Sequence, residues 1–521
     1  MGDLNTPTQA LLSAFKKAAD LDNRTPKTTG AFKVSRAISA AAFWYEKLRT
    51  AMEYRDEHLL RRSAIQRILT RRLLQTNDST DLATFLLKEL IWARYLQSNQ
   101  VHEDDIVKIA GLIEKYLPIV SRAANPIMRN WLIAIAASDL EKVIAESYWT
   151  RQEALANFVY YFLNQQLEFS GNLSQDEAHV QLYIAIWRAF VHADEELISF
   201  QLIKQKYPDW EAQLSQFEGR FEDVKNDIDK DLQSPLSEKL QRFVERNIPA
   251  FLVVRDMLED FPDQEQTIIA DPEKLEEVVN QICQKRYHST RDLVRRAVFR
   301  SIIYIFLTKM IFAFILEIPI DRLISGGVSY LVLAINSLFP PVLMFALSLS
   351  IQIPDQSNTN RIVSLLKHVF YDGTMSLPKA RIQVGEATGK PILSAIFKIL
   401  YGLAFLVSFG IIYYVLNQLH FSLISKAVFV FFVSVVSFFA YRIRKTAHQY
   451  LFEEKEGLLS PITDFFWVPV LRVGRIFSNG LEQINLLLFF FDLAIEAPFK
   501  VIFDLAEEWS SFIRSKKEEI G

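Results

Sequence analysis

The sequence predicts an all-α membrane protein, with a cytoplasmic helical domain, a four-helix transmembrane bundle and a C-terminal helical hairpin at the membrane interface. Three observations predict this class. Alternation of apolar and polar residues with the period of a strand is nowhere sustained between residues 35 and 290. Four long apolar runs lie after residue 297. The chain has only 16 glycines and 18 prolines, which favours helices over long linkers.

The average composition conceals a division of the chain into two halves. Lys plus Arg is 58, Asp plus Glu is 61 and hydrophobic residues are 50%, values that are ordinary for a globular protein. However, six of the eight tryptophans lie before residue 211. We therefore predict a partly disordered N-terminal segment, the cytoplasmic domain, the transmembrane domain and the membrane-associated hairpin with its tail at residues 1–34, 35–290, 291–445 and 446–521.

Several functional classes are excluded by composition and motifs. The net charge of −3 excludes a surface built as a whole for nucleic acid, so we expect no nucleic-acid partner. The single cysteine, Cys283, excludes a disulfide framework. Residues 385–390 are one residue short of a P-loop between the glycines, and Pro391 stands where Ser or Thr would bind magnesium. With no metal-ligand or catalytic set in the sequence, we expect neither a cofactor nor an enzyme.

Helix-starting signals are spread along the first half of the chain. Asn125 with Pro126 supplies a cap and a first-turn proline. Ser174 with Glu177 fits a capping box. Ser234-Pro235 and Asp271-Pro272 open two further helices. Residues 1–290 are therefore expected to fold into a helical domain without the membrane.

Four segments meet the requirement of about 20 mostly apolar residues for a transmembrane helix. They are residues 298–316, 328–351, 392–416 and 421–440. Lys and Arg are frequent before the first, between the second and third, and after the fourth, and scarce in the other two connections. By the positive-inside rule, both termini face the cytoplasm, and we expect a bacterial plasma membrane.

Two further segments are expected to lie at the membrane surface. Apolar residues at 362, 365, 366, 369 and 370 predict a helix in the headgroup layer, with packing on the soluble domain as the alternative. In the tail, Ser478-Asn479-Gly480 predicts a turn between two apolar segments that dip into the membrane. The alternative is two additional spans, which would bury the charges in these segments at a cost of several kcal/mol each.

A run of basic residues precedes these elements, at positions 47–72. Arginines interleave with leucine and isoleucine there and form a candidate basic face: Arg61, Arg62, Arg67, Arg71 and Arg72. Such a helix binds anionic headgroups or RNA phosphates, or is simply the solvated outer face of a bundle helix. Nearby carboxylates dilute the positive charge, which favours the solvated face.

Lys309 is the candidate functional residue, because it lies near the middle of the first apolar run. A charge at that depth needs a partner. Candidates are Asn336 and Ser337 in the second run, or Asp492 and Glu496 in the tail. A structural salt bridge is one interpretation. The other is a transport site, since Pro340 and Pro341 would bend or break the second span beside Lys309.

These features favour a membrane-anchored scaffold that recruits a partner, with membrane lipids and a protein or a second copy of the chain as partners. The alternative function is a channel or transporter subunit, with Lys309 and the Pro340-Pro341 kink lining its path. The third class, an enzyme acting on lipids, lacks a recognisable acid, base or nucleophile in this sequence.

Overall fold

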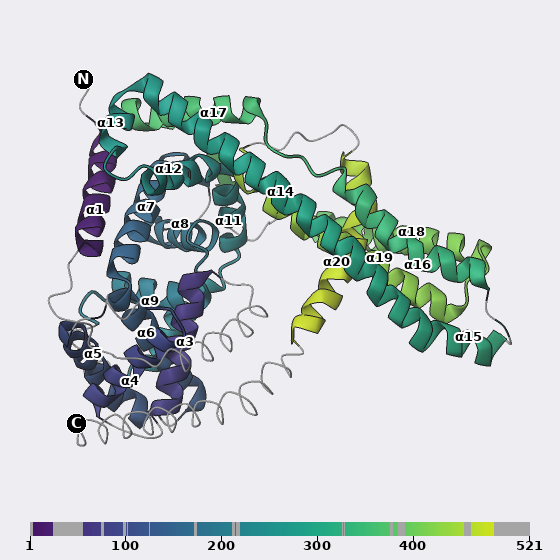
Figure 1. Ribbon diagram of the computed structural model, residues 1–521, viewed down its shortest axis with the longest axis horizontal. Coiled ribbons are helices and arrows are strands. Elements are labelled where there is room, and N and C mark those ends of the chain that lie inside the picture. The colour runs from purple at the N-terminus through teal and green to yellow at the C-terminus, as the bar shows by residue number, and fades with distance from the viewer. Residues whose placement is uncertain are drawn as a thin grey trace, which may run out of the picture. The chain divides into compact units, whose positions relative to one another are not determined.

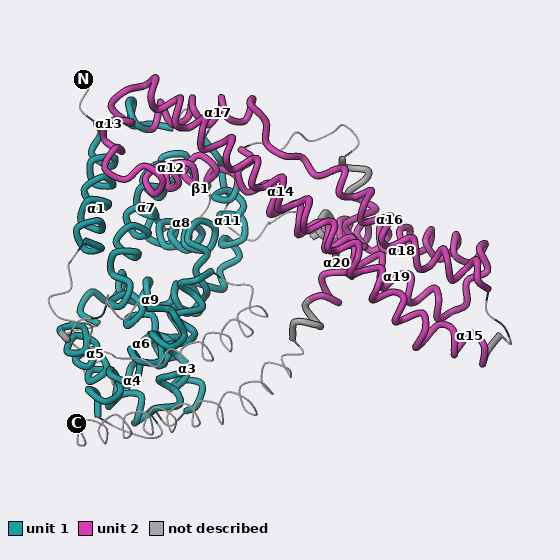
Figure 2. The backbone as a smooth tube through the Cα atoms, in the orientation of Figure 1, with its two compact units in different colours: residues 1–245, 370–382, 486–521 teal, residues 246–369, 383–485 magenta. Residues whose placement is uncertain are grey.

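The computed structural model describes residues 4–23, 56–73, 78–96, 101, 103–123, 125–170, 174–210, 214, 219–325, 327, 329–375, 379–383, 391–452 and 460–483. Helices dominate these residues, so the all-α prediction is confirmed. The chain divides into two compact units, residues 1–245, 370–382 and 486–521 in unit 1, and residues 246–369 and 383–485 in unit 2 (Figure 2). The expected domain boundary at residue 290 concerns whether residues 1–290 fold independently, and it stays a prediction.

Unit 1 is a set of packed helices (Figure 1), and its described residues also form a short two-stranded sheet of β1 and β2. Its elements are α1 (Thr6–Asp22), α3 (Glu57–Arg72), α4 (Ser79–Trp92), α5 (Glu103–Arg122), α6 (Pro126–Ile144), α7 (Glu146–Gln165), β1 (Leu167–Ser170), α8 (Gln175–Ala189), α9 (Glu195–Lys206), α10 (Phe221–Leu232), α11 (Leu236–Asn247), whose last residues belong to unit 2, and β2 (Ala380–Gln383).

The expected caps start helices in unit 1. The side chain of Asn125 accepts a hydrogen bond from the backbone N–H of Ile127, with Pro126 in the first turn of α6. Ser174 and Glu177 form the complete capping box of α8. These caps satisfy backbone N–H groups that have no partner within the helix. The apolar faces then bury large side chains, and the rings of Trp149 and Trp187 stack 6.1 Å apart in the core.

Residues 370–382, which connect the second and third apolar helices, belong to unit 1. The Asn5 amide donates a hydrogen bond to the carbonyl of Phe370 at 3.0 Å. The buried ring of Phe370 stacks on Phe158 of α7, and β2 pairs with β1. Through Phe370, Met375 and Ile382, this connection contributes buried side chains to the core of unit 1.

Unit 2 is organised along one long helix, α14 (Pro272–Phe312) (Figure 1). Asp271 caps it, with Pro272 in the first turn, as the sequence predicts. The other elements are α12 (Pro249–Asp260), α13 (Glu265–Ala270), the π-helix η2 (Ala313–Glu317), α15 (Ile318–Ser325), α16 (Tyr330–Ser348), α17 (Gln356–Lys367), the π-helix η3 (His368–Asp372), which ends in unit 1, α18 (Pro391–Gln418), α19 (Leu423–Ala447), the 3-10 helix η4 (His448–Tyr450) and α20 (Ser460–Gln483).

Among the described residues of unit 2, four helical stretches are long and apolar enough to cross a membrane: Pro272–Leu323, Tyr330–Ser348, Ala395–Gln418 and Leu423–Tyr450. These coincide with the four apolar runs of the sequence, so that prediction is confirmed in length and composition. A core cluster joins three of these stretches, α14, α16 and α19, through Val298, Ile305, Met344, Phe432 and Val436. The outward side chains are mostly apolar as well, which suits helices surrounded by lipid.

A polar cluster ties together the elements at the start of unit 2. Both oxygens of the fully buried Asp256 accept hydrogen bonds from Arg286 at 2.6 Å, and Tyr450 donates to the same carboxylate at 2.9 Å. Asn358 of α17 donates to the Tyr287 hydroxyl at 2.7 Å and to the Tyr450 carbonyl at 2.8 Å. The cluster therefore joins α12, α14, α17 and η4.

Two expectations about surface segments are wrong. The apolar stripe of α17 is buried and packs on α12 and α14, so this helix does not lie in a headgroup layer. In the tail, α20 continues through residues 478–480 to Gln483, so no turn interrupts it there. The second arm of the expected hairpin, with Asp492 and Glu496, lies outside the described residues. The alternative of two additional spans in the tail stays a prediction.

α16 runs through Pro340 and Pro341 as one helix, so these prolines do not end it. Both prolines are buried. Proline lacks the N–H that would bond to the preceding turn, and its ring crowds the carbonyl four residues before. Neighbouring helices offset this loss inside the bundle, as they do in many transmembrane helices.

Candidate functional site

The most unusual site in unit 2 is an ion pair between Lys309 of α14 and Glu317 of η2. The two side chains are 0% and 1% exposed, so the pair is removed from solvent even without a membrane around it. A carboxylate and an ammonium that share such a site must pair closely, because an isolated buried charge costs many kcal/mol.

The π-helix η2 explains why Glu317 reaches Lys309. In a regular α-helix, at about 100° per residue, a residue eight positions on would lie about 80° around the helix. A π-helix makes i→i+5 hydrogen bonds and turns less per residue. The five π-helical residues Ala313–Glu317 therefore bring the glutamate back toward the face of Lys309.

Two other helices complete the site. The Asn336 amide of α16 donates to Glu317 Oε2 at 2.7 Å and to the carbonyl of Ser425 on α19 at 3.4 Å. The Lys309 ammonium lies 5.2 Å from the centre of the Phe432 ring, a cation–π contact. Three apolar helices thus meet around one pair of opposite charges.

Two oxygens at α16 have no hydrogen-bond partner among the described residues. They are Asn336 Oδ1 and Ser337 Oγ, and both residues are buried. A buried polar atom without a partner is uncommon and is often satisfied by an ordered water. The site is therefore polar beyond the ion pair itself.

The partners that the sequence suggested for Lys309 have different outcomes. Asn336 does belong to the site, although it bonds to Glu317 rather than to Lys309. Asp492 and Glu496 lie outside the described residues. The sequence analysis missed Glu317, although it is the only carboxylate between Asp292 and Asp321 and could have been found by that rarity.

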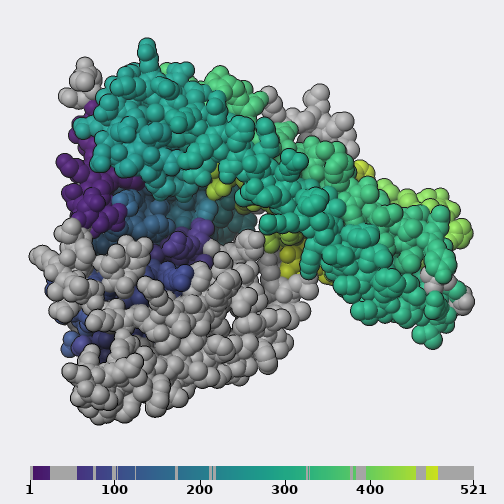
Figure 3. Space-filling view, in the orientation of Figure 1, coloured from purple at the N-terminus to yellow at the C-terminus, as the bar shows by residue number. Residues whose placement is uncertain are grey.

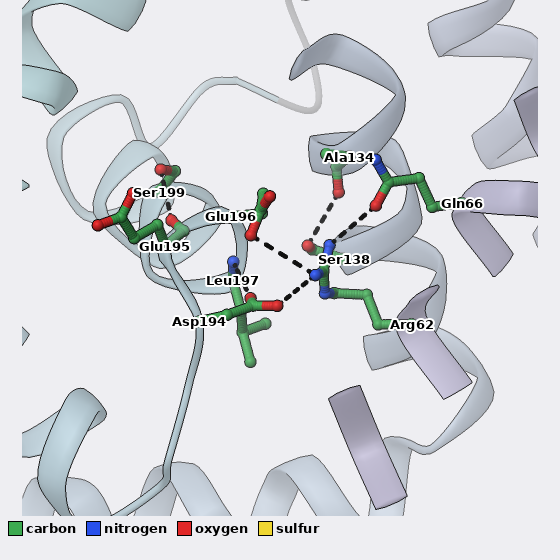
Figure 4. Close-up of polar contacts among 9 residues, drawn as sticks. All are labelled: Arg62, Gln66, Ala134, Ser138, Asp194, Glu195, Glu196, Leu197 and Ser199. Carbon is green, nitrogen blue, oxygen red and sulfur yellow. Dashed lines mark hydrogen bonds and ion pairs between the residues drawn. The ribbon is translucent and has the colours of Figure 1, made fainter. Parts of the chain in front are cut away.

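The arginines of the candidate basic face turn inward, so neither a solvated nor a lipid-binding face is formed by this set. Arg61, Arg62 and Arg72 are buried, and Arg67 and Arg71 are half-buried. Arg61 binds Glu141 through two nitrogens, at 2.8 and 2.9 Å. Figure 4 shows Arg62 directed at Asp194 and Glu196, from the start of α9. Arg71 and Arg72 share Glu89 of α4.

These pairs make α3 a central helix of unit 1 rather than a surface helix. The guanidinium groups reach three neighbouring helices: Arg61 reaches α6, Arg62 reaches the start of α9, and Arg71 and Arg72 both reach α4. A bidentate guanidinium–carboxylate pair fixes geometry as well as charge. The basic residues of α3 therefore join neighbouring helices of unit 1 through ion pairs.

His58 lies in the same region and packs against two aromatic rings. Its ring centroid is 5.7 Å from that of Tyr148 and 5.6 Å from that of Trp149. The Tyr148 hydroxyl and His58 Nδ1 form a hydrogen bond of 3.1 Å. The pKa of His58 is lowered to about 4, mainly by burial; the charge of Asp56 raises it and that of Arg61 lowers it. The imidazole is therefore neutral at pH 7.

No protein-family model matches the chain, and neither does any curated protein or solved structure. Similarity to a known protein therefore assigns no activity to Lys309, Glu317 or any other residue. Within the part of the chain that the structure describes, no three His, Cys, Asp or Glu side chains come together as a metal site. The contacts themselves support a structural site in the bundle and a rigid helical unit 1.

Proposed function

We propose that this chain is an integral membrane protein that holds a helical domain at the cytoplasmic face of a bacterial plasma membrane and recruits a protein partner there. The four apolar helices support insertion. The distribution of Lys and Arg around them supports a cytoplasmic location of both termini and of unit 1. Membrane lipids and a protein partner, or a second copy, are the binding partners that this role implies.

The observation that carries the proposal is the contribution of Phe370, Met375 and Ile382 to the core of unit 1. A domain that is merely tethered needs one flexible link to its membrane helices. Here the connection between the second and third apolar helices supplies the buried Phe370, the strand β2 and the Met375 carbonyl, to which Gln166 Nε2 donates at 3.0 Å. Unit 1 is thus built partly from the membrane half of the sequence, as suits a fixed platform.

A channel or transporter subunit is the second candidate, and the site around Lys309 favours it. A π-helix, a buried ion pair and two unsatisfied oxygens within apolar helices are features of functional membrane sites. Against this, the pair is closed and packed on Phe432. The same contacts suit a lock that holds α14, α16 and α19 together.

Purification in mild detergent, combined with flux measurements in liposomes, separates the two candidates. We expect a protein to co-purify in stoichiometric amount with the wild type and with the double variant Lys309→Met with Glu317→Gln. We expect it to be lost from Phe370→Asp, which disturbs the platform, while Tyr371→Asp, a change at an exposed neighbour, retains it. Ion or solute flux that is abolished by the double variant, without any stoichiometric partner, would overturn the scaffold.

A further inference from the structure

A stripe of exposed residues along α14 changes from cationic to apolar within one helical turn. Arg296 and Arg300 are one turn apart, and Ile303, Leu307 and Ile311 continue on the same side of the helix. The apolar members are 45%, 55% and 55% exposed. Val294, Val298 and Ile305 lie on the opposite side and are buried in the core. Figure 3 shows α14 as a continuous teal surface on the viewed face of unit 2.

Arg296 and Arg300 are available for a ligand. Both side chains are exposed, and neither takes part in a hydrogen bond or ion pair among the described residues. Asp292 is the only carboxylate between residues 287 and 316. Other exposed cations on the two helices are Arg291 and Arg295 on α14 and Arg442, Arg444 and Lys445 on α19.

The length of the apolar part matches an acyl chain. From Arg300 to Ile311 the helix rises about 16 Å, at about 1.5 Å per residue. One leaflet contributes roughly 15 Å of the ~30 Å hydrocarbon core. A phosphate beside Arg296 and Arg300 would therefore place its acyl chain along Ile303, Leu307 and Ile311, down to about the middle of the bilayer.

We propose that this stripe, formed by Arg296, Arg300, Ile303, Leu307 and Ile311, binds one anionic phospholipid, with its phosphate between the two guanidinium groups. Arginine suits this task because its planar fork binds phosphate oxygens in pairs. The adjoining apolar residues favour a lipid over a nucleic acid, whose phosphates need no acyl groove. The inference rests on the proposed membrane insertion of α14, which alkaline extraction of membranes tests separately.

The experiment measures the apparent affinity of the purified full-length protein for phosphatidylglycerol and for phosphatidylcholine, by native mass spectrometry during lipid titration. We expect the wild type to bind phosphatidylglycerol more tightly. The double variant Arg296→Gln with Arg300→Gln should lose about 30-fold for phosphatidylglycerol, at about 1 kcal/mol per cation. It should change little for phosphatidylcholine. The variant Arg296→Lys with Arg300→Lys should bind phosphatidylglycerol more tightly than the glutamine variant but less tightly than the wild type, because it keeps both charges and loses the paired guanidinium contacts.

Lys108→Gln with Lys115→Gln is the matched control, because it removes two exposed cations from α5 in unit 1. It should bind phosphatidylglycerol as the wild type does. Glycerol phosphate, the headgroup chemistry without acyl chains, should displace the lipid poorly. The proposal would be overturned if the wild type bound both lipids equally or if the control lost as much affinity as the arginine variant. Efficient displacement by glycerol phosphate, or RNA binding in place of lipid discrimination, would also overturn it.

Discussion

Gly474 of α20 lies directly against the backbone of Ser434 on α19. A Cβ atom at position 474 would stand 2.0 Å from the Ser434 carbonyl oxygen and 2.8 Å from Phe438 Cβ. Because the first obstacle is backbone, a small side-chain movement cannot relieve it. Small residues at such crossings let membrane helices approach closely.

Gly474→Ala should therefore separate α19 from α20 and lower the thermal stability of the protein in detergent. Overpacking of this kind costs about 1–3 kcal/mol. Gly410→Ala on α18 is the control, since nothing lies within 4 Å of its added Cβ. The measurement is the melting temperature of both variants in the same detergent. A Gly474→Ala protein as stable as Gly410→Ala would show that the helices do not pack so closely.

Breaking the buried pair of Lys309 and Glu317 should be more harmful than removing it. Lys309→Met leaves Glu317 without its partner, at a cost of about 3–5 kcal/mol, and Glu317→Gln has the converse effect. The double variant should recover much of the loss, because neither charge remains buried alone. Lys398→Met, at an exposed position of α18, should be nearly neutral. Additive losses in the double variant, measured by unfolding in detergent, would contradict the pairing.

The polar cluster of unit 2 offers a matched pair of aspartates. Asp256→Asn removes the charge that two nitrogens of Arg286 and the Tyr450 hydroxyl approach. Because Arg286 is 37% exposed, solvent reduces the penalty, and we expect a loss of about 2 kcal/mol. Asp260→Asn breaks only an exposed contact with Lys285 and should cost less than about 1 kcal/mol. Chemical unfolding of the two variants ranks them, and the reverse order would refute this role of Asp256.

His58 should make the stability of unit 1 depend on pH. The pKa of His58 is about 4 in the folded protein, against an ordinary value of 6.5 in the unfolded chain. As the pH falls, the unfolded chain therefore takes up a proton at His58 before the folded protein does. The contribution of the neutral imidazole is fully present above about pH 6.5 and is lost as the pH falls to about 4. The loss amounts to about 3 kcal/mol, at 1.36 kcal/mol per pKa unit.

His58→Gln should remove this part of the pH dependence. Urea unfolding followed by tryptophan fluorescence reports on the site, because Trp149 packs on His58. The wild type should lose stability relative to His58→Gln between pH 6.5 and 4. Parallel pH profiles for the two proteins would mean that His58 titrates alike in both states.

The proposed orientation is tested with reporter fusions. Fusions after residue 290, at Ser325 and at Asp372 should report the cytoplasm, the outside and the cytoplasm, since one apolar helix separates each from the next. An outside location of Asp372 would be incompatible with the place of residues 370–382 in unit 1 and with a cytoplasmic unit 1.

Local patterns in the sequence determined the helical class, the four long apolar helices and the starts of α6, α8 and α14. Each depends on residues close in the chain: about twenty apolar residues in a row, or a capping side chain within three residues of the N–H it binds. Such signals need no knowledge of the rest of the fold. The same reasoning singled out Lys309, because a charge inside an apolar run is visible in the sequence alone.

The tertiary structure decided the partners of those side chains. Glu317 pairs with Lys309 only because the π-helix η2 turns it toward that face, and sequence spacing predicts a different face. The arginines of α3 are cationic in any arrangement, yet Glu141, Asp194 and Glu89 come from distant segments and draw them inward. Likewise, the amphipathic pattern of α17 is compatible with packing against either lipid or protein. The contacts of α17 with α12 and α14 show that it packs against protein. An amphipathic or charged pattern shows that a helix face requires an apolar or oppositely charged partner. Only the folded structure shows which residues provide that partner.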